Sequence, residues 1–162
     1  MLVIADTSPF IGLIKIGQVN VLPRLYGAVV IPKAVADELG SANRSAEIRA
    51  FIASPPAWLT IRSPVAVEII PELGEGEQAA ISLARELSAD ILLIDEKAGR
   101  LAAIARNIRT LRTTALLFDA AKAGLLPDLR EAYEKLANTN FRVDRKTLEE
   151  LLRQYDKFRS NG

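Results

Sequence analysis

Two short apolar segments, each followed by an aspartate, constrain the fold of this chain more than any other feature. Residues 2–5 precede Asp6, and residues 91–94 precede Asp95. Apolar runs of this kind are typical of strands that are buried on both faces of a parallel sheet. Because ligands of open α/β folds bind at the carboxyl ends of such strands, both aspartates are predicted to lie at one functional edge.

Strands and helices are predicted to alternate along the rest of the chain. Further strands are predicted at 28–31, 58–61 and 108–111, and helices at 9–16, 19–26, 32–39, 45–53, 77–87, 96–106, 113–123, 127–137 and 145–159. This alternation predicts a three-layer α/β/α sandwich with a parallel sheet of four to five strands. The length predicts a single domain over 1–162. Within it we expect a core of about 2–125 and a helical C-terminal tail at 126–162.

The chain contains neither histidine nor cysteine. Their absence excludes Ser-His-Asp and Cys-His catalysis, disulfides and ordinary zinc sites. Catalysis must therefore use carboxylates, lysine, tyrosine, a hydroxyl group, or an oxygen-ligated metal ion such as Mg²⁺ or Mn²⁺. The net charge of +1 gives no general attraction to nucleic acid, so any basic surface must be local.

We expect a cytoplasmic location without a membrane partner. Met1 directly precedes the first predicted strand, without the basic segment and cleavage site of a signal peptide. No apolar run approaches the ~20 residues of a membrane span.

Two glutamates join the aspartates as candidate site residues. Glu77 is in register with Ile81 and Ala84 on the apolar face of its helix, and Glu38 lies at the edge of the apolar face of another helix. Each acid also has an ordinary structural explanation. The aspartates can form turns after strands, Glu77 can interact with its helix N-terminus, and Glu38 can be a surface residue.

Together the four acids favour a metal site over these separate explanations. Two carboxylates about 5 Å apart repel by roughly 3 kcal/mol at an effective dielectric constant of ~20. Converging acids therefore have raised pKa values unless a cation joins them. Oxygen ligands suit Mg²⁺ or Mn²⁺, which can lower the pKa of a water molecule and stabilise charge on a phosphoryl oxygen.

Five short motifs occur in a defined order. They are Asp6-Thr7-Ser8-Pro9, Ile31-Pro32-x-x-Val35-x-x-Glu38-Leu39, Gly76-Glu77-x-x-Ala80-Ile81-x-Leu83-Ala84, Leu93-Ile94-Asp95-Glu96-Lys97-x-x-Arg100 and Ala121-Lys122-x-Gly124-Leu125. In this order and spacing the chain resembles the PIN-domain nucleases, in particular the branch related to the toxins of VapBC toxin–antitoxin systems. The resemblance extends from residue 2 to about residue 125.

The resemblance implies a sheet of order 3-2-1-4-5 and Mg²⁺- or Mn²⁺-dependent endoribonuclease activity. It implies an RNA substrate, an antitoxin protein as partner, and a homodimer. The catalytic and metal-binding acids that it implies are Asp6, Glu38, Glu77 and Asp95. Ser8 and Thr7 are implied as supporting residues beside the metal.

The chain departs from the family pattern at two places. More familiar members have an aspartate where Glu77 stands, and closer relatives often have Gly-Thr where this chain has Thr113-Thr114. The longer Glu77 side chain changes the reach of that ligand, and Thr113 restricts the backbone more than glycine does. Thr114 still offers a supporting hydroxyl group. Both departures bear on catalytic activity more than on the fold.

Basic residues near the second aspartate are candidates for contact with RNA. Arg100 is the preferred phosphate contact, and an ion pair with a surface acid is its ordinary explanation. We interpret Arg106, Arg109 and Arg112 as solvated surface residues.

The last predicted helix carries an apolar stripe. It consists of Leu148, Leu151, Leu152, Tyr155 and Phe158. Core packing is the favoured explanation of this stripe, and a surface for homodimerisation or for an antitoxin is the alternative.

The leading hypothesis is therefore a metal-dependent ribonuclease. A non-catalytic RNA-binding or interaction module of the same fold is one alternative. A haloacid-dehalogenase-like phosphohydrolase with Asp6 as nucleophile is another, although Ser8 stands where that chemistry usually has a second aspartate. A hydrolase using Ser8 and Lys15 lacks an oxyanion motif.

Overall fold

Five short parallel strands form the centre of the computed structural model, which describes residues 1–162. The strands are β1 (Val3–Ala5), β2 (Val29–Ile31), β3 (Leu59–Ile61), β4 (Ile91–Leu93) and β5 (Thr110–Leu111). Their order across the sheet is β3-β2-β1-β4-β5, which confirms the predicted topology. Because β1 and β4 are neighbours, the residues that follow them emerge side by side at the carboxyl edge.

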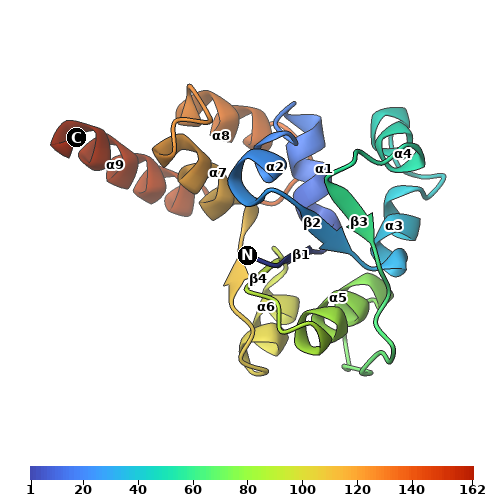
Figure 1. Cartoon of the computed structure of the whole chain (residues 1–162). Coiled ribbons are helices and arrows are strands. Elements are labelled where there is room, and N and C mark those ends of the chain that lie inside the picture. The colour runs from blue at the N-terminus through green and yellow to red at the C-terminus, as the bar shows by residue number, and fades with distance from the viewer.

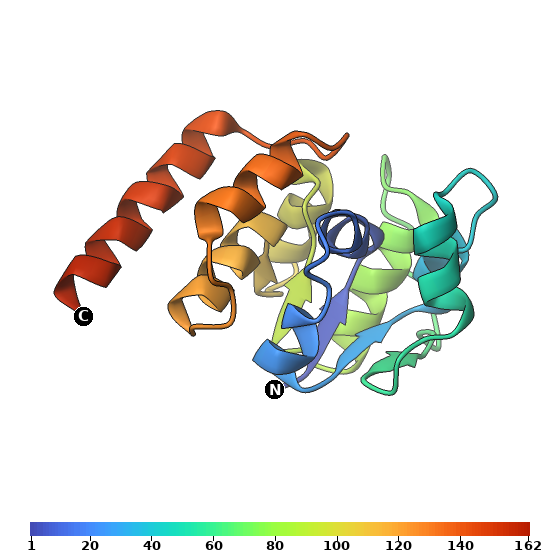
Figure 2. The same cartoon turned by 90° about the horizontal axis from the view of Figure 1, so that it is seen from above.

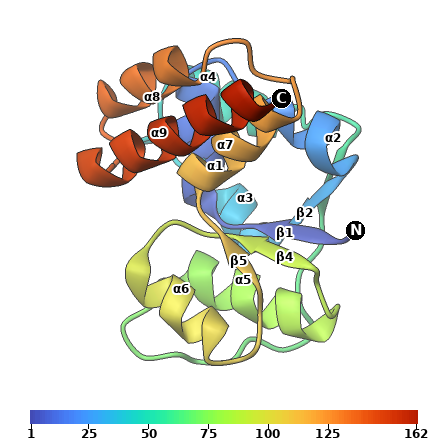
Figure 3. The same cartoon turned by 90° about the vertical axis from the view of Figure 1, so that its left-hand side faces the viewer.

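Nine helices surround the sheet (Figure 1). They are α1 (Thr7–Lys15), α2 (Val21–Tyr26), α3 (Lys33–Leu39), α4 (Ala46–Ala53), α5 (Glu75–Glu86), α6 (Lys97–Ile104), α7 (Thr113–Lys122), α8 (Leu129–Ala137) and α9 (Arg145–Asn161). Figure 3 shows α1, α7, α8 and α9 on one side of the sheet, with α5 and α6 on the other. The predicted three-layer α/β/α architecture is confirmed.

The two faces of the sheet bury separate apolar clusters. In β1, Val3 and Ala5 belong to the larger cluster beneath α1 and α7, whereas Ile4 belongs to the smaller cluster beneath α5. In β4, Leu93 and Leu92 divide between the clusters in the same way. Alternate side chains of a strand point to opposite faces, so strands covered on both sides need apolar residues at every position.

The first helix begins earlier than the sequence pattern predicts. Ser8 and Pro9 were expected at the N-cap and the first helical position, but Asp6 is the N-cap and Thr7 the first helical residue. Pro9 therefore lies at the third position, where its missing N–H costs no helical hydrogen bond. Asp6 thus lies at the junction of β1 and α1.

The C-terminal helices pack on the body of the molecule. Leu148 and Leu152 of α9 are buried in the larger cluster, and Leu151 and Tyr155 pack against it. Core packing therefore accounts for most of the apolar stripe of α9, whereas Phe158 is 45% exposed. Figure 2 shows α9 lying along one end of the molecule beside α7 and α8. None of the helices combines the length and the apolar character needed to cross a membrane.

Candidate active site

The four predicted acids come from four different elements and meet at the carboxyl edge of the sheet. Asp6 follows β1, Asp95 lies two residues beyond β4, Glu38 lies on α3, and Glu77 lies in the first turn of α5. The charges of the other three acids all act to raise the pKa of Asp6, so one negative region includes all four.

Asp6 is the most deeply buried acid of this group. It is 4% exposed, and its Oδ1 has no hydrogen-bond partner. Burial raises the pKa of Asp6 to about 7, since the charged form loses its hydration. The Thr7 backbone amide opposes this change, and the charges of Glu77, Glu38 and Asp95 add to it. Although Asp6 is the N-cap of α1, its side chain makes no capping hydrogen bond.

Two donors from neighbouring helices hold Glu38 in place. Thr7 Oγ1 donates a hydrogen bond of 2.6 Å to Oε2, and the Gly76 backbone N–H donates one of 3.1 Å to Oε1. A Cβ at position 76 would lie 2.4 Å from Glu38 Oε1, so this close approach requires glycine. Glu38 thereby connects α1, α3 and α5, and the interpretation as a plain surface residue is wrong.

Glu77 has one occupied and one free carboxylate oxygen. Its Oε1 accepts a 3.1 Å hydrogen bond from the Gly74 backbone N–H, as expected for an acid at a helix N-terminus. Its Oε2 is buried without a partner, and a Cβ at position 99 would lie 2.7 Å from this atom. Burial is the largest cause of the raised pKa of Glu77. One oxygen thus caps the helix, and the other remains available to a ligand.

Asp95 is oriented by Thr113. Its Oδ1 accepts a 2.9 Å hydrogen bond from the Thr113 backbone N–H, and its Oδ2 accepts a 2.7 Å bond from Thr113 Oγ1. Burial raises the pKa of Asp95, while the Thr113 bonds and the charges of Arg112 and Arg100 lower it. The sequence predicts that Thr114 supplies the supporting hydroxyl, but in the structure it is the Thr113 hydroxyl that binds the acid. Two adjacent threonines give no sequence signal for choosing between them.

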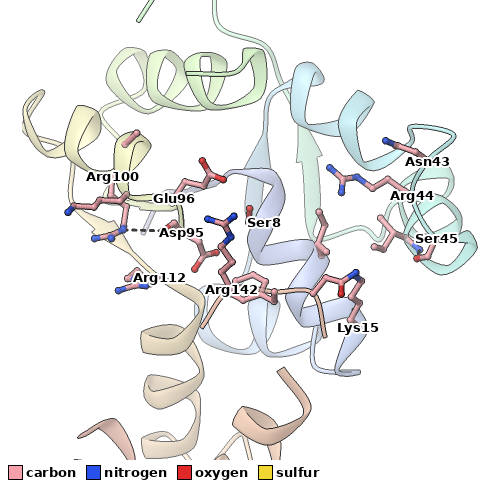
Figure 4. A pocket seen from close by; sticks show the side chains of 16 residues that line it. Ser8, Lys15, Asn43, Arg44, Ser45, Asp95, Glu96, Arg100, Arg112 and Arg142 are labelled. Atoms are coloured by element: carbon pink, nitrogen blue, oxygen red, sulfur yellow. Dashed lines mark hydrogen bonds between the residues drawn. The ribbon is translucent and has the colours of Figure 1, made fainter. Parts of the chain in front are cut away.

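An open pocket of about 870 Å³ lies beside Asp95 (Figure 4). Ser8 and Arg100, the predicted supporting residue and phosphate contact, are both among the residues that line it. Arg100 Nε donates a 3.2 Å hydrogen bond to the Asp95 carbonyl, so the ion pair with a surface acid is not formed. Arg112 also lines the pocket with a buried, unpartnered Nε, which corrects its interpretation as a solvated residue.

Other residues of this region were missed or lie elsewhere. Arg142, in the segment between α8 and α9, lines the same pocket, although no sequence motif marked it. Arg106 instead pairs with Glu68 away from the pocket lining, and Arg109 is exposed. Only the folded chain reveals which of these cations lie near the acids.

The donor set suits a hard divalent cation. The unpartnered, buried oxygens of Asp6 and Glu77 lie in a negative region, and every candidate ligand is a carboxylate. As they stand, no three acidic side chains are close enough to form a ready-made metal cluster. The fit to Mg²⁺ or Mn²⁺ thus rests on the oxygen donors and the negative charge of the region. Asp6, Glu38, Glu77 and Asp95 are the residues that would hold the ion.

Comparisons with known proteins agree with the fold. A model of the family DUF3368, described as a PIN domain, matches residues 2–157. A PilT N-terminus domain protein from the hyperthermophilic archaeon Sulfolobus solfataricus P2 is similar in structure. The TM-score is 0.57 at 17% sequence identity, and the match covers 74% of this chain and 93% of that chain. No curated protein matches the sequence.

The chain belongs to the PIN-domain family, because the family model matches nearly its whole length. PIN domains form a superfamily of nucleases, and these nucleases typically use divalent metal ions.

Proposed function

We propose that this protein is a Mg²⁺- or Mn²⁺-dependent endoribonuclease that hydrolyses phosphodiester bonds in RNA. The observation that carries the proposal is the group of four acids at the carboxyl edge of the sheet, in which two buried carboxylate oxygens lack partners. Uncompensated buried acids are costly, so their presence at a ligand-binding edge favours a bound cation.

The residues of this site have two roles, as ligands of the metal ion and as donors that orient those ligands. Asp6, Glu38, Glu77 and Asp95 hold the metal, while Thr7, Gly76 and Thr113 orient Glu38 and Asp95. A bound divalent ion supplies Lewis-acid stabilisation of charge on phosphoryl oxygens and lowers the pKa of water. Ser8 and Arg100 line the open pocket, in which Asp95 is the one member of the four acids. A phosphodiester in this pocket would therefore approach the site past Asp95.

Cleavage assays with Asp6→Asn and Asp95→Asn test the proposal. Both substitutions keep the size of the side chain and remove a charged ligand. We expect Mn²⁺-dependent cleavage of single-stranded RNA by the wild-type protein and a loss of at least about a hundredfold in each variant. Asp37→Asn, an exposed acid on α3 outside the site, is the matched control. Wild-type activity in both site variants would overturn the assignment.

We further propose that the protein is the toxin of a toxin–antitoxin pair, held by a cognate antitoxin and present as a homodimer in the cytoplasm. The likeness of its motif order to VapBC toxins supports this role. Induced expression should arrest bacterial growth, and Asp6→Asn should abolish the arrest. Co-expression of an adjacent antitoxin gene should restore growth. Absence of both the growth arrest and the rescue would reject the toxin role and leave the proposed nuclease activity untouched.

A non-catalytic module of the same fold is the second candidate. It is favoured by the occupied oxygens of Glu38 and Asp95 and by the lack of a ready-made three-acid cluster. Calorimetric titration with Mn²⁺ near neutral pH distinguishes the nuclease from the non-catalytic module. The nuclease requires that the wild-type protein binds Mn²⁺ and that Asp6→Asn removes this binding, whereas the non-catalytic module requires neither. The family assignment counts against the haloacid-dehalogenase-like alternative.

A further inference from the structure

Cationic side chains from separate parts of the chain line the pocket beside Asp95 (Figure 4). They are Lys15, Arg44, Lys97, Arg100, Arg112 and Arg142. None of them takes part in an ion pair, since the ion pairs of the protein use other lysines and arginines. Only two acids, Asp95 and Glu96, line the pocket beside these six cations, so it carries an excess of positive charge next to Asp95.

Arg100 and Arg112 form the innermost part of this cationic surface. Both act on the carboxyl group of Asp95, and the charge of Arg112 also disfavours the charged form of Arg100. The two guanidinium groups are thus close enough to repel each other. The carboxylate oxygens of Asp95 accept hydrogen bonds from Thr113 and not from either arginine, whereas Arg100 Nε donates to the backbone carbonyl of Asp95.

Arg112 is held in an arrangement that leaves a donor unsatisfied. It is the N-cap of α7 and is half-buried, and its Nε has neither a protein partner nor contact with solvent. An unpaired buried donor costs about 1–3 kcal/mol. Anions in the pocket cannot reach this buried Nε–H, but the terminal N–H groups of Arg100 and Arg112 make no hydrogen bond within the protein. These terminal groups are the donors that an anion with several acceptor oxygens would satisfy.

We infer that Arg100 and Arg112 together bind one phosphate of the RNA strand whose scissile phosphodiester lies at the four acids. This inference rests on the proposed function for the identity of the strand. Phosphate fits better than carboxylate, because it presents enough oxygens for two guanidinium groups at once. Arg142 lines the same pocket and would contact the same strand.

The segment that carries Arg142 is fixed against the body of the protein. The ring of Phe141 lies over Gly12 of α1, where an added Cβ would be 3.0 Å from the ring. Phe141 lines the same pocket, and its anchoring places Arg142 at the mouth. The C-terminal tail thereby completes a pocket that otherwise consists of residues from the first 112 positions.

Binding of a fluorescein-labelled single-stranded oligouridine, measured by anisotropy in EDTA, tests this inference without cleavage. We expect Arg100→Gln and Arg112→Gln each to weaken binding about tenfold. The logarithm of the association constant falls linearly with the logarithm of the salt concentration. Each substitution should make this slope shallower by about 0.7, the value for one phosphate of a single strand. Because both residues bind the same phosphate, the double variant should lose less than the product of the single losses.

Arg109→Gln is the matched control, since Arg109 is exposed and lies outside the pocket. The melting temperature of Arg112→Gln should be equal to or higher than that of the wild-type protein, because the substitution removes the unsatisfied buried Nε–H of Arg112. A loss of binding in this variant is then not a loss of folding. Arg112→Lys, which keeps the charge without the planar fork, should give intermediate affinity. Wild-type affinity and salt slope in Arg112→Gln, or equal losses in Arg109→Gln, would overturn the inference.

These results distinguish the binding of one phosphate by Arg100 and Arg112, here called the clamp, from the proposed nuclease activity. Arginine-dependent binding without Mn²⁺-dependent cleavage would support the clamp and reject the proposed activity. Cleavage that Asp6→Asn abolishes, together with unchanged binding by Arg112→Gln, would support the nuclease and reject the clamp.

Discussion

Gly76 determines whether Glu38 can reach the site. The Glu38 carboxylate lies so close to the backbone of α5 that no side chain fits at position 76. The same contact supplies a backbone N–H that donates a 3.1 Å hydrogen bond to Glu38 Oε1. A glycine that contributes no functional group thus holds a predicted ligand in place.

Gly76→Ala is therefore expected to displace Glu38 and break its hydrogen bond from α5. The unfolding free energy should fall by about 1–3 kcal/mol, and Mn²⁺ affinity should fall about tenfold or more. Denaturant unfolding and calorimetric titration measure the two effects. Gly40→Ala is the control, because a Cβ there makes only ordinary contacts, the nearest at 3.5 Å. Wild-type metal affinity in Gly76→Ala would contradict this account of Glu38.

Thr113 plays a comparable role for Asp95. Thr113→Val keeps the side-chain volume and removes the hydroxyl that donates to Oδ2. Since this bond favours the charged carboxylate, the pKa of Asp95 should rise further and stability should fall by about 1–3 kcal/mol where Asp95 is charged. The loss should shrink as pH falls through the pKa of Asp95. Unfolding of Thr113→Val and of the control Thr114→Val at several pH values would test this, and equal effects would refute the assignment.

The sequence predicts the aspartates of the site better than their surroundings. Asp6 and Asp95 each follow an apolar strand, so one-dimensional pattern and sheet geometry suffice to place them together. The supports of the site, such as Thr113 and Gly76, depend on contacts between elements 18 to 38 residues apart in the chain. Such contacts follow from helix packing and leave no periodic signal in a single sequence.

The sequence predicts which strands and helices form better than it predicts the residues at which each of them begins and ends. β5 is only Thr110–Leu111, because Asn107 turns the chain with a positive φ of 61° before the strand. A helix start at Ser8–Pro9 was predicted from residue preferences, whereas the end of β1 sets it at Thr7. Tertiary packing therefore decides the boundaries that local propensity leaves open.

The contact between α8 and α7 is a structural one that is separate from the site. Tyr133 is buried on α8, and its hydroxyl donates a 2.8 Å hydrogen bond to the Thr114 carbonyl at the start of α7. Tyr133→Phe should lower the unfolding free energy by about 1 kcal/mol and leave the cleavage rate of the folded protein unchanged. Tyr155→Phe, whose hydroxyl makes no hydrogen bond in the structure, should have no effect on either quantity. A reduced cleavage rate in Tyr133→Phe would show that α8 positions the site.

The molecule as a whole combines a nearly neutral charge with strong local separation of charge. Its net charge is +1, yet four acids gather at the sheet edge beside a pocket lined by unpaired cations. Bulk composition therefore gives no sign of nucleic-acid binding. In the proposed function, the phosphates of an RNA strand would lie in the cationic pocket and a metal ion would lie at the acids.

The proposed metal site should make the stability of the whole molecule depend on pH. The pKa of Asp6 is about 7 in the folded protein and 3.8 in a model carboxyl, so the folded state holds an extra proton between these values. The unfolding free energy of the metal-free protein should therefore fall as pH rises from about 4 to about 7, by on the order of 4 kcal/mol from this group. The raised pKa values of Glu77 and Asp95 act in the same direction.

Mn²⁺ should reverse this loss, because the ion binds the charged carboxylates of the folded state. At a free Mn²⁺ concentration of a hundred times its dissociation constant, the unfolding free energy should increase by about 3 kcal/mol at pH 8 and by much less at pH 5. Asp6→Asn should be more stable than the wild type at pH 8 without metal, show a flatter pH profile, and lose the stabilisation by Mn²⁺. Denaturant unfolding with and without Mn²⁺ measures all three. A wild-type stability that rises between pH 5 and pH 8 in EDTA would mean that burial of Asp6 carries no electrostatic strain for a cation to relieve.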